Sequence, residues 1–367
     1  MKVALAGGGT GGHVFPSIAI AEELRKRDPH LQLMYLGTSG SIEERVATEM
    51  MIPFRPIVVE GMPAGNVFRK FRSVLSAVVG LSQSLAILFR FRPNAVVGTG
   101  GYVSLPPILA ASALRIPTII HEQNCIPGRA NRLGCRFADV VTIHFDKSRH
   151  HFPAVAPRVV GNPIRSDFLP QRLEVIDRGE SRRKLGLNAD KFTVLLLGGS
   201  RGAHSLNVAM VDALPHLDPR CFQLVCMTGK EDYREVRAAC ERAGIPAAVF
   251  RFIDDMVTAY TAADLVISRA GASTLAEITA VGIPAILVPY PHATGRHQEL
   301  NARVLVEEGA AEMIMNGELR GDMLAEKICS LSRDEESLNH MRSRSKQLGK
   351  PDAAERVVNI LFELIFK

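Results

Sequence analysis

The chain has 367 residues, of which 47% are hydrophobic and 22% charged, with a formal net charge of +6 at pH 7. This length and composition indicate a soluble α/β protein of two domains, and the first apolar run, which breaks at Gly7, is too short for a signal peptide. The positive charge fits an anionic partner and equally a slightly basic enzyme without one.

Short apolar runs alternate with amphipathic helical patterns through the first half of the chain. Such runs predict buried parallel strands, and the alternation predicts βαβ crossovers. The expected strands are 3–6, 31–36, 56–59, 95–97, 118–120, 140–143 and 159–160, and the helices include 17–27 and 41–51.

The pattern restarts after a polar stretch at residues 171–184. The expected strands of the second half are 192–197, 223–227, 249–252, 265–267 and 285–288. We therefore predict two doubly wound parallel-sheet domains, residues 1–163 and 164–350, with a linker near 162–168. A break at 349–351 would let a last helix, 352–366, return to the first domain, so that 351–367 joins it.

Three glycine-rich turns, residues 7–13, 98–102 and 198–203, each follow an expected strand and precede a helical pattern. Unpaired N–H groups and the helix dipole make such turns anion sites. The turns predict a protein that holds two phosphate-bearing ligands between two domains.

The first turn also matches the G-x-G-x-x-G pattern of dinucleotide-binding proteins. That interpretation needs an acidic residue at the end of the second strand to hold the ribose. Here the strand runs into Gly37, while Asp28 precedes the strand, and Glu43 and Glu44 fall inside the next helix. A nicotinamide-dependent dehydrogenase is therefore disfavoured.

A better nucleotide site follows strand 265–267. Residues 268–277 are mostly small and open a helix, which leaves N–H groups for a diphosphate. Glu277, about one turn inside, can accept two hydrogen bonds from a ribose diol, although a solvated helix position explains it equally well. A polar loop at 289–301 follows the next strand, at the edge where open α/β sheets bind ligands.

No metal site is expected. Adjacent Asp254 and Asp255 open a helix and are interpreted as caps. His144, His150 and His151 lack ligand spacing, and the six cysteines, which include no C-x-x-C pair, are interpreted as reduced thiols of a cytosolic protein.

Seven motifs stand in order along the chain, from residue 4 to about 310: residues 8–13, 98–102, 121–124, 161–165, 198–203, 252–256 and 271–277, with a weaker match at 351–357. This series resembles the MurG family of glycosyltransferases. The resemblance implies the two-domain GT-B fold, no cofactor, and inverting transfer of N-acetylglucosamine from UDP-N-acetylglucosamine. The acceptor would be the C4 hydroxyl of N-acetylmuramic acid in undecaprenyl-pyrophosphoryl-N-acetylmuramyl-pentapeptide (lipid I), giving lipid II for peptidoglycan.

The resemblance also implies site residues. On the donor side, the Ile253 backbone would meet uracil, Glu277 the ribose, and the diphosphate would be held by Ser200, Arg165 and the N–H groups of Ala272, Ser273, Thr274, Leu275 and Ala276. The sugar side would be completed by Thr10, Gly11, Gly12, Asn124 and Gln298, and the acceptor would meet Gly9, Gly100, Gly101, Tyr102 and Asn131. Two departures are Arg201, where the family usually has glutamine, and a longer loop at 292–296, which favours Gln298 over His297.

His13 is the candidate base for the acceptor hydroxyl. It opens the first helix, where the positive end of the dipole disfavours imidazolium and keeps the ring able to accept a proton. A structural capping role is the alternative for His13. Glu122, at the end of strand 118–120, is the rival base.

We expect the first domain to dock on an anionic membrane through residues 66–92. The flanking cluster of Phe68, Arg69, Lys70, Phe71 and Arg72 would meet the surface. The uncharged middle, 74–89, is interpreted as too short to cross a bilayer and mostly as a core helix on the sheet. A lipid-linked acceptor makes peripheral docking at the cytoplasmic face of the bacterial inner membrane useful.

Three other functions remain open at this point. They are another GT-B lipid glycosyltransferase, for example one acting on diacylglycerol, a UDP-N-acetylglucosamine 2-epimerase, and a binding module without catalysis. No nucleic-acid partner is expected, and other cell-wall synthesis proteins are partners to consider.

Overall fold

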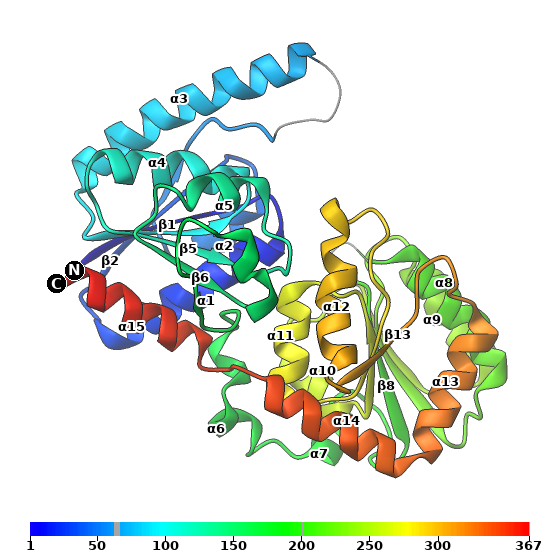
Figure 1. Ribbon diagram of the computed structural model, residues 1–367. Coiled ribbons are helices and arrows are strands. Elements are labelled where there is room, and N and C mark those ends of the chain that lie inside the picture. The colour runs from blue at the N-terminus through cyan, green and yellow to red at the C-terminus, as the bar shows by residue number, and fades with distance from the viewer. Residues whose placement is uncertain (62–66, 200–201, 367) are drawn as a thin grey trace. The chain divides into compact units, whose positions relative to one another are not determined.

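The computed structural model describes residues 1–61, 67–199 and 202–366, with the backbone alone for 67–70. The chain forms two compact units (Figure 1). Unit 1 is Met1–Ser166 with Pro351–Lys367, and unit 2 is Asp167–Lys350. The division after Ser166 lies close to the predicted boundary after residue 163.

Unit 1 is built on a seven-stranded parallel sheet in the order β3-β2-β1-β4-β5-β6-β7. Its central strands are buried along almost their whole length, as expected for a parallel sheet covered on both faces. The strands are β1 (Lys2–Gly7), β2 (Gln32–Gly37), β3 (Phe54–Pro56), β4 (Ala95–Gly100), β5 (Thr118–Glu122), β6 (Val140–Ile143) and β7 (Arg158–Val159).

Helices cover both faces of this sheet. In Figure 1, α1 (Gly11–Arg27) and α15 (Ala353–Ile365) lie on one face, and α3 (Val67–Phe91) and α4 (Leu105–Ala113) on the other. The last helix, α15, is part of the core, since Val357 and Leu361 are fully buried in one cluster with strand β1. Two shorter helices, α2 (Ile42–Glu49) and α5 (Arg129–Gly134), follow β2 and β5.

Unit 2 repeats the architecture with a six-stranded parallel sheet in the order β10-β9-β8-β11-β12-β13. Its strands are β8 (Phe192–Leu197), β9 (Phe222–Met227), β10 (Ala247–Phe250), β11 (Leu265–Ser268), β12 (Ala285–Leu287) and β13 (Ala311–Met313). Its helices are α6 (Pro170–Leu173), α7 (Arg178–Lys184), α8 (His204–Ala213), α9 (Tyr233–Ala243), α10 (Met256–Ala262), α11 (Ala272–Val281), α12 (His297–Glu307), α13 (Gly321–Arg333) and α14 (Glu335–Leu348).

The structure departs from the sequence-based expectation in several elements, among them the strand expected at 249–252, which lies at Ala247–Phe250. The strand expected at 56–59 lies at Phe54–Pro56, and the short edge strand β13 was not predicted. Helix α1 begins at Gly11 rather than at residue 17, because two glycines and Pro16 hide its first turns from a propensity argument.

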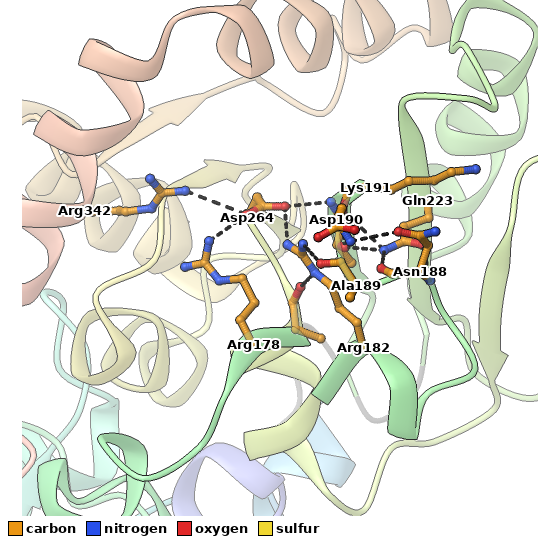
Figure 2. A network of polar contacts seen from close by, with 11 residues as sticks. Arg178, Arg182, Asn188, Ala189, Asp190, Lys191, Gln223, Asp264 and Arg342 are labelled. Atoms are coloured by element: carbon orange, nitrogen blue, oxygen red, sulfur yellow. Dashed lines mark hydrogen bonds and ion pairs between the residues drawn. The ribbon is translucent and has the colours of Figure 1, made fainter. Parts of the chain in front are cut away.

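Asp264, just before β11, ties the first part of unit 2 to its sheet (Figure 2). Its carboxylate accepts from the guanidiniums of Arg182 at 2.5 Å and Arg178 at 2.8 Å, both on α7, and from the Thr193 N–H at 2.8 Å. Arg342 of α14 lies 3.9 Å away. Arg182 is buried, so its positive charge and the negative charge of Asp264 must compensate each other. This ion pair holds α7 against the sheet of unit 2.

Candidate functional site

In the middle of each parallel sheet the strand order reverses, so that the strands that come next in the chain are added on opposite sides of this point. In unit 1 this switch point lies between β1 and β4, and in unit 2 between β8 and β11. Ligands of open α/β sheets bind beyond the carboxyl ends of the strands at such a point. The first glycine turn begins at the end of β1, and the second includes the last residues of β4, which runs on to Gly100 rather than ending at residue 97. The described part of the third turn follows β8, and residues 268–277 begin at the end of β11. The structure therefore places all four predicted segments at the two switch points.

The two turns of unit 1 interlock. The Gly8 N–H donates to the Gly100 carbonyl at 3.2 Å, and a Cβ on Gly101 would lie 2.2 Å from the Gly8 oxygen. Gly101 also has a φ of +76°. A side chain there is excluded both by space and by backbone conformation.

His13 projects from the start of α1 toward β5. Its Nδ1 lies 3.1 Å from Oε1 of Gln123, and the Nε2 of Gln123 donates to the Thr99 carbonyl at 2.6 Å. Because a carbonyl can only accept, the Gln123 amide is oriented with Oε1 toward His13, so Nδ1 carries the proton. His13 is thereby held in the tautomer whose Nε2 is an acceptor, as a general base requires.

Glu122 is buried and holds the loop that follows β5. Its Oε1 accepts from the backbone N–H and the side-chain amide of Asn124 at 2.9 and 3.2 Å, and its Oε2 accepts from the Gly128 N–H at 3.1 Å and the Asn131 amide at 2.9 Å. Among the described residues, the Glu122 carboxylate thus accepts four hydrogen bonds from residues 124–131. The geometry suits a residue that shapes residues 124–131 better than one that removes a proton.

Asn131 lies beside the second glycine turn. A Cβ on Gly100 would be 2.9 Å from His13 Nδ1 and 3.2 Å from Asn131 Nδ2, so the three residues meet. Asn131 is 2% exposed, and its Oδ1 has no hydrogen-bond partner among the described residues. A buried amide oxygen with no partner is costly unless a ligand or water supplies a donor.

His121, on the same strand, is fully buried, and burial lowers its pKa to about 4. Its ring nitrogens contact Thr142 Oγ1 at 3.0 Å and Asn162 Oδ1 at 3.1 Å. His121 is therefore neutral and joins β5 to β6 and to the segment after β7. The sequence motif at 121–124 indicated this strand end but gave no role to His121 or Gln123.

In unit 2, the predicted donor site includes the N-terminal end of helix α11. Gly271 is its N-cap residue, and the Leu275 N–H already donates to the Gly271 carbonyl at 3.0 Å. The N–H groups of residues 272–274 precede this first bond of the helix and stand at its N-terminal end. The prediction for the N–H groups of Leu275 and Ala276 is untested, but both have acceptors within α11.

Glu277 lies half-buried on α11, and its Oε2 accepts from the Tyr260 hydroxyl at 3.0 Å. Tyr260, on α10, is 1% exposed and therefore a rigid partner. The loop before α10 carries Ile253, whose side chain is buried, and Asp255, which caps α10 by accepting from the Thr258 N–H at 3.0 Å. The interpretation of Asp255 as a cap is confirmed.

Arg269 joins four segments at the carboxyl edge of this sheet, and sequence analysis missed it. It donates to the Val288 and Pro289 carbonyls at 3.1 and 3.3 Å, to Asn316 Oδ1 at 2.8 Å and to Ser205 Oγ at 2.7 Å. Nearby, Oε1 of Gln298 accepts from the Tyr290 N–H at 2.9 Å, which orients the amide of this predicted sugar contact.

The predicted donor residues are divided between the two units, and one of them lies outside the described residues. Ser200, like Arg201, lies outside the described residues. Thr10, Gly11, Gly12, Asn124 and Arg165 belong to unit 1, whereas residues 272–277 belong to unit 2, and their common use of one ligand remains a prediction. Within the described ranges, no group of three or more His, Cys, Asp or Glu side chains could hold a metal ion.

Two family models together cover most of the chain. Residues 3–143 match the glycosyltransferase family 28 N-terminal domain, and residues 193–357 match its C-terminal domain. The chain belongs to glycosyltransferase family 28. Each model falls on one of the two sheets, so the two-domain GT-B fold predicted from the sequence is confirmed.

Family 28 relatives match over their full length. The protein of Bacillus licheniformis is 42% identical over 99% of both chains, and that of Bacillus subtilis is 38% identical over 99% of both. Both are named UDP-N-acetylglucosamine–N-acetylmuramyl-(pentapeptide) pyrophosphoryl-undecaprenol N-acetylglucosamine transferase. These relatives confirm the resemblance to the MurG family.

Solved structures agree with this assignment. Acinetobacter baumannii MurG superimposes with a TM-score of 0.80 at 31% identity, over 99% of both chains. A UDP-N-acetylglucosamine 2-epimerase from Neisseria meningitidis gives a TM-score of 0.68 at 13% identity, over 99% of this chain and 100% of that one. At this identity the likeness to the epimerase shows the fold alone.

Proposed function

We propose that this chain transfers N-acetylglucosamine from UDP-N-acetylglucosamine to the C4 hydroxyl of N-acetylmuramic acid in lipid I, giving lipid II. The observation that carries the proposal is the full-length identity of 42% to a relative with this activity in its name. Peptidoglycan synthesis is the process that this reaction serves.

In unit 1, His13 acts as the base. Its Nε2 accepts the proton of the acceptor hydroxyl as that oxygen attacks the anomeric carbon of the donor sugar with inversion. Gln123 fixes the tautomer, and Glu122 positions the loop rather than removing the proton. The unpartnered Oδ1 of Asn131 is a ready acceptor for a donor group of the bound acceptor molecule.

In unit 2, the start of α11 holds the diphosphate through the N–H groups of residues 272–274. Negative charge develops on the β-phosphate as UDP leaves, and donors fixed in advance stabilise it without a metal ion. Glu277, oriented by Tyr260, binds the ribose. Ile253, Ser200 and Gln298, with Arg165 of unit 1, complete the proposed donor contacts.

One assay separates the proposal from its alternatives. The purified chain is incubated with labelled UDP-N-acetylglucosamine and either lipid I, diacylglycerol or no acceptor. Label appearing in lipid II supports the proposal. Label in glycolipid, conversion of the donor to its 2-epimer, or binding without turnover would each replace it with one of the other three functions.

Helix α3 agrees only in part with the core helix expected for residues 74–89: Leu88 is fully buried and Leu81 and Leu85 pack against the same core cluster, whereas the first half of the helix presents apolar residues outward. Five side chains spaced along one face are exposed: Phe71 (70%), Val74 (51%), Leu75 (55%), Val78 (55%) and Val79 (40%). We call these five residues the α3 apolar face. On the opposite face the buried residues are small along the first part of the helix, namely Ser73, Ser76, Gly80 and Ser84, and Leu88 is buried near its end. A Cβ on Gly80 would lie 2.7 Å from the Val58 carbonyl, so the helix packs closely there.

The length of α3 also corrects the expectation that its uncharged middle, 74–89, marks a segment too short to cross a bilayer. Within the described residues, Phe71–Phe91 is long and apolar enough to cross a membrane by length and composition alone, and only 22% of its most apolar stretch is buried. Because its small face is packed on unit 1, we propose peripheral docking of the α3 apolar face into a membrane at the cytoplasmic face of the bacterial inner membrane. Arg72 is paired with Glu60 at 2.7 Å, and the side chains of Phe68, Arg69 and Lys70 lie outside the described residues.

Replacing Val74, Leu75 and Val78 together by Ser is expected to lower liposome binding about tenfold or more, because apolar surface that enters the interface is lost. Co-sedimentation with vesicles containing anionic lipid measures the binding.

A second variant, in which Arg69, Lys70 and Arg72 are replaced by Ser, should weaken liposome binding mainly at low salt. The matched control is Val175→Ser with Val208→Ser, two exposed valines of unit 2. Equal binding of the α3 variant and this control would place the docking surface elsewhere.

A further inference from the structure

A closed loop joins β12 to helix α12 at the carboxyl edge of the unit 2 sheet. One end of the loop is Tyr290, whose N–H donates to Oε1 of Gln298 at 2.9 Å. Within the loop, the Ala293 N–H donates to the Tyr290 carbonyl at 3.2 Å, and the Arg296 N–H donates to the Ala293 carbonyl at 2.8 Å. The two ends of the loop are therefore tied to each other by the protein itself.

Arg296 is the residue from which α12 starts, and its backbone is in the left-handed region. It is the N-cap residue of the helix with a φ of +56°, and it follows Gly295, which has a φ of +62°. A residue with a Cβ rarely adopts this conformation and keeps it where its surroundings fix it. Here an ion pair supplies such a contact. Nε of Arg296 donates to Oε2 of Glu299 at 2.8 Å, and Nη2 lies 2.5 Å from the same oxygen.

Glu299 holds the start of α12 from inside the protein. It is 7% exposed, and its other oxygen, Oε1, accepts from Nη2 of Arg303, one turn farther along the helix, at 2.9 Å. Close packing does not fix the loop on this side, because a cavity of about 140 Å³ is lined by residues 289–291 and 315–317 together with Arg296 and Glu299. The ion pair is therefore the contact that sets the position of Arg296.

The orientation of Gln298 decides what this loop offers to a ligand. Because a backbone N–H can only donate, the Gln298 amide must turn its oxygen toward Tyr290. The amide nitrogen, with its two N–H groups, then points away from Tyr290. Gln298 therefore meets a ligand as a hydrogen-bond donor, which suits the hydroxyl and carbonyl oxygens of a sugar.

We propose that Arg296 and Glu299 are positioning residues for recognition of the donor sugar: their ion pair holds the start of α12 so that the Gln298 amide presents its N–H donors to the sugar oxygens. Both act through Gln298 rather than by touching the sugar. The inference rests on the proposed function, because it assumes that the sugar of UDP-N-acetylglucosamine reaches Gln298. The ion pair should then affect affinity for the sugar part of the donor and not for the nucleotide, whose proposed contacts are at α11.

Calorimetric titrations of UDP and of UDP-N-acetylglucosamine into the full chain, without acceptor, measure the two affinities separately. Arg296→Gly removes the guanidinium and places at this position a residue that adopts a positive φ without strain. This variant is expected to bind UDP-N-acetylglucosamine about fivefold more weakly while its UDP affinity stays unchanged. Arg296→Lys keeps a cation within reach of Glu299 and should stay close to the parent chain.

Two comparisons determine whether Arg296 acts through Gln298. Arg303→Gln removes the other arginine of Glu299 without touching the loop, and both affinities should stay unchanged. Arg296→Gly combined with Gln298→Ala should bind UDP-N-acetylglucosamine no more weakly than Gln298→Ala alone. Additive losses in this double variant, an equal loss for UDP, or unchanged affinities in the folded Arg296→Gly chain would overturn the inference. A parent chain that binds UDP but not UDP-N-acetylglucosamine would overturn the proposed function and, with it, this inference.

Discussion

Replacing His13 by Ala is expected to lower kcat by about 10²–10⁴-fold while UDP affinity stays unchanged, because a general base contributes about that factor. The donor contacts at α11 belong to the other unit and are not touched. Steady-state transfer from UDP-N-acetylglucosamine to a soluble lipid I analogue, together with calorimetric titration of UDP, measures both quantities.

Two further variants distinguish the general base from the residues that position it or the neighbouring loop. Gln123→Leu leaves His13 present but removes the acceptor that fixes its tautomer, so an intermediate loss of about tenfold in kcat is expected. Glu122→Gln keeps the size of the side chain and should act by loosening residues 124–131, with an effect on KM for the acceptor as well as on kcat. A His13→Ala chain with near-normal turnover beside an inactive, folded Glu122→Gln chain would transfer the role of base to Glu122.

The sequence best predicts those strands and turns that are determined by the pattern of neighbouring residues. The strand at residues 192–197 was predicted to the residue, because six consecutive apolar or β-branched residues in a buried parallel strand leave no ambiguity. The glycine turns were found for a related reason, since a turn that another backbone approaches closely, as Gly8 approaches Gly101, admits no side chain.

Features that depend on contacts between residues far apart in the chain could not be predicted from the sequence. The tautomer of His13, on α1, is set by Gln123, which follows β5, and the Gln123 amide is itself oriented by the Thr99 carbonyl of β4. The exposure of Val74 and Val78 follows from which face of α3 has the small residues that pack, and not from the apolar run itself.

Replacing Glu277 by Ala is expected to weaken UDP binding about 30- to 150-fold, which corresponds to a loss of roughly 2–3 kcal/mol for hydrogen bonds to a charged group. The carboxylate is held by Tyr260, so the ribose meets an acceptor whose position is fixed before binding. Calorimetric titration of UDP into the folded variant measures the effect.

The ribose assignment is tested most directly with 2′-deoxy-UDP, which lacks one of the two hydroxyls that Glu277 would bind. The parent chain should bind it more weakly than UDP, whereas Glu277→Ala should bind the two nucleotides nearly equally, because the group that distinguishes them is gone. Tyr260→Phe is the matched control: it keeps the carboxylate and removes only the hydroxyl that orients it, so a smaller loss of about two- to tenfold is expected. If Glu277→Ala loses affinity for both nucleotides by the same factor, Glu277 does not contact the ribose 2′-hydroxyl, and its effect on UDP must pass through the start of α11 instead.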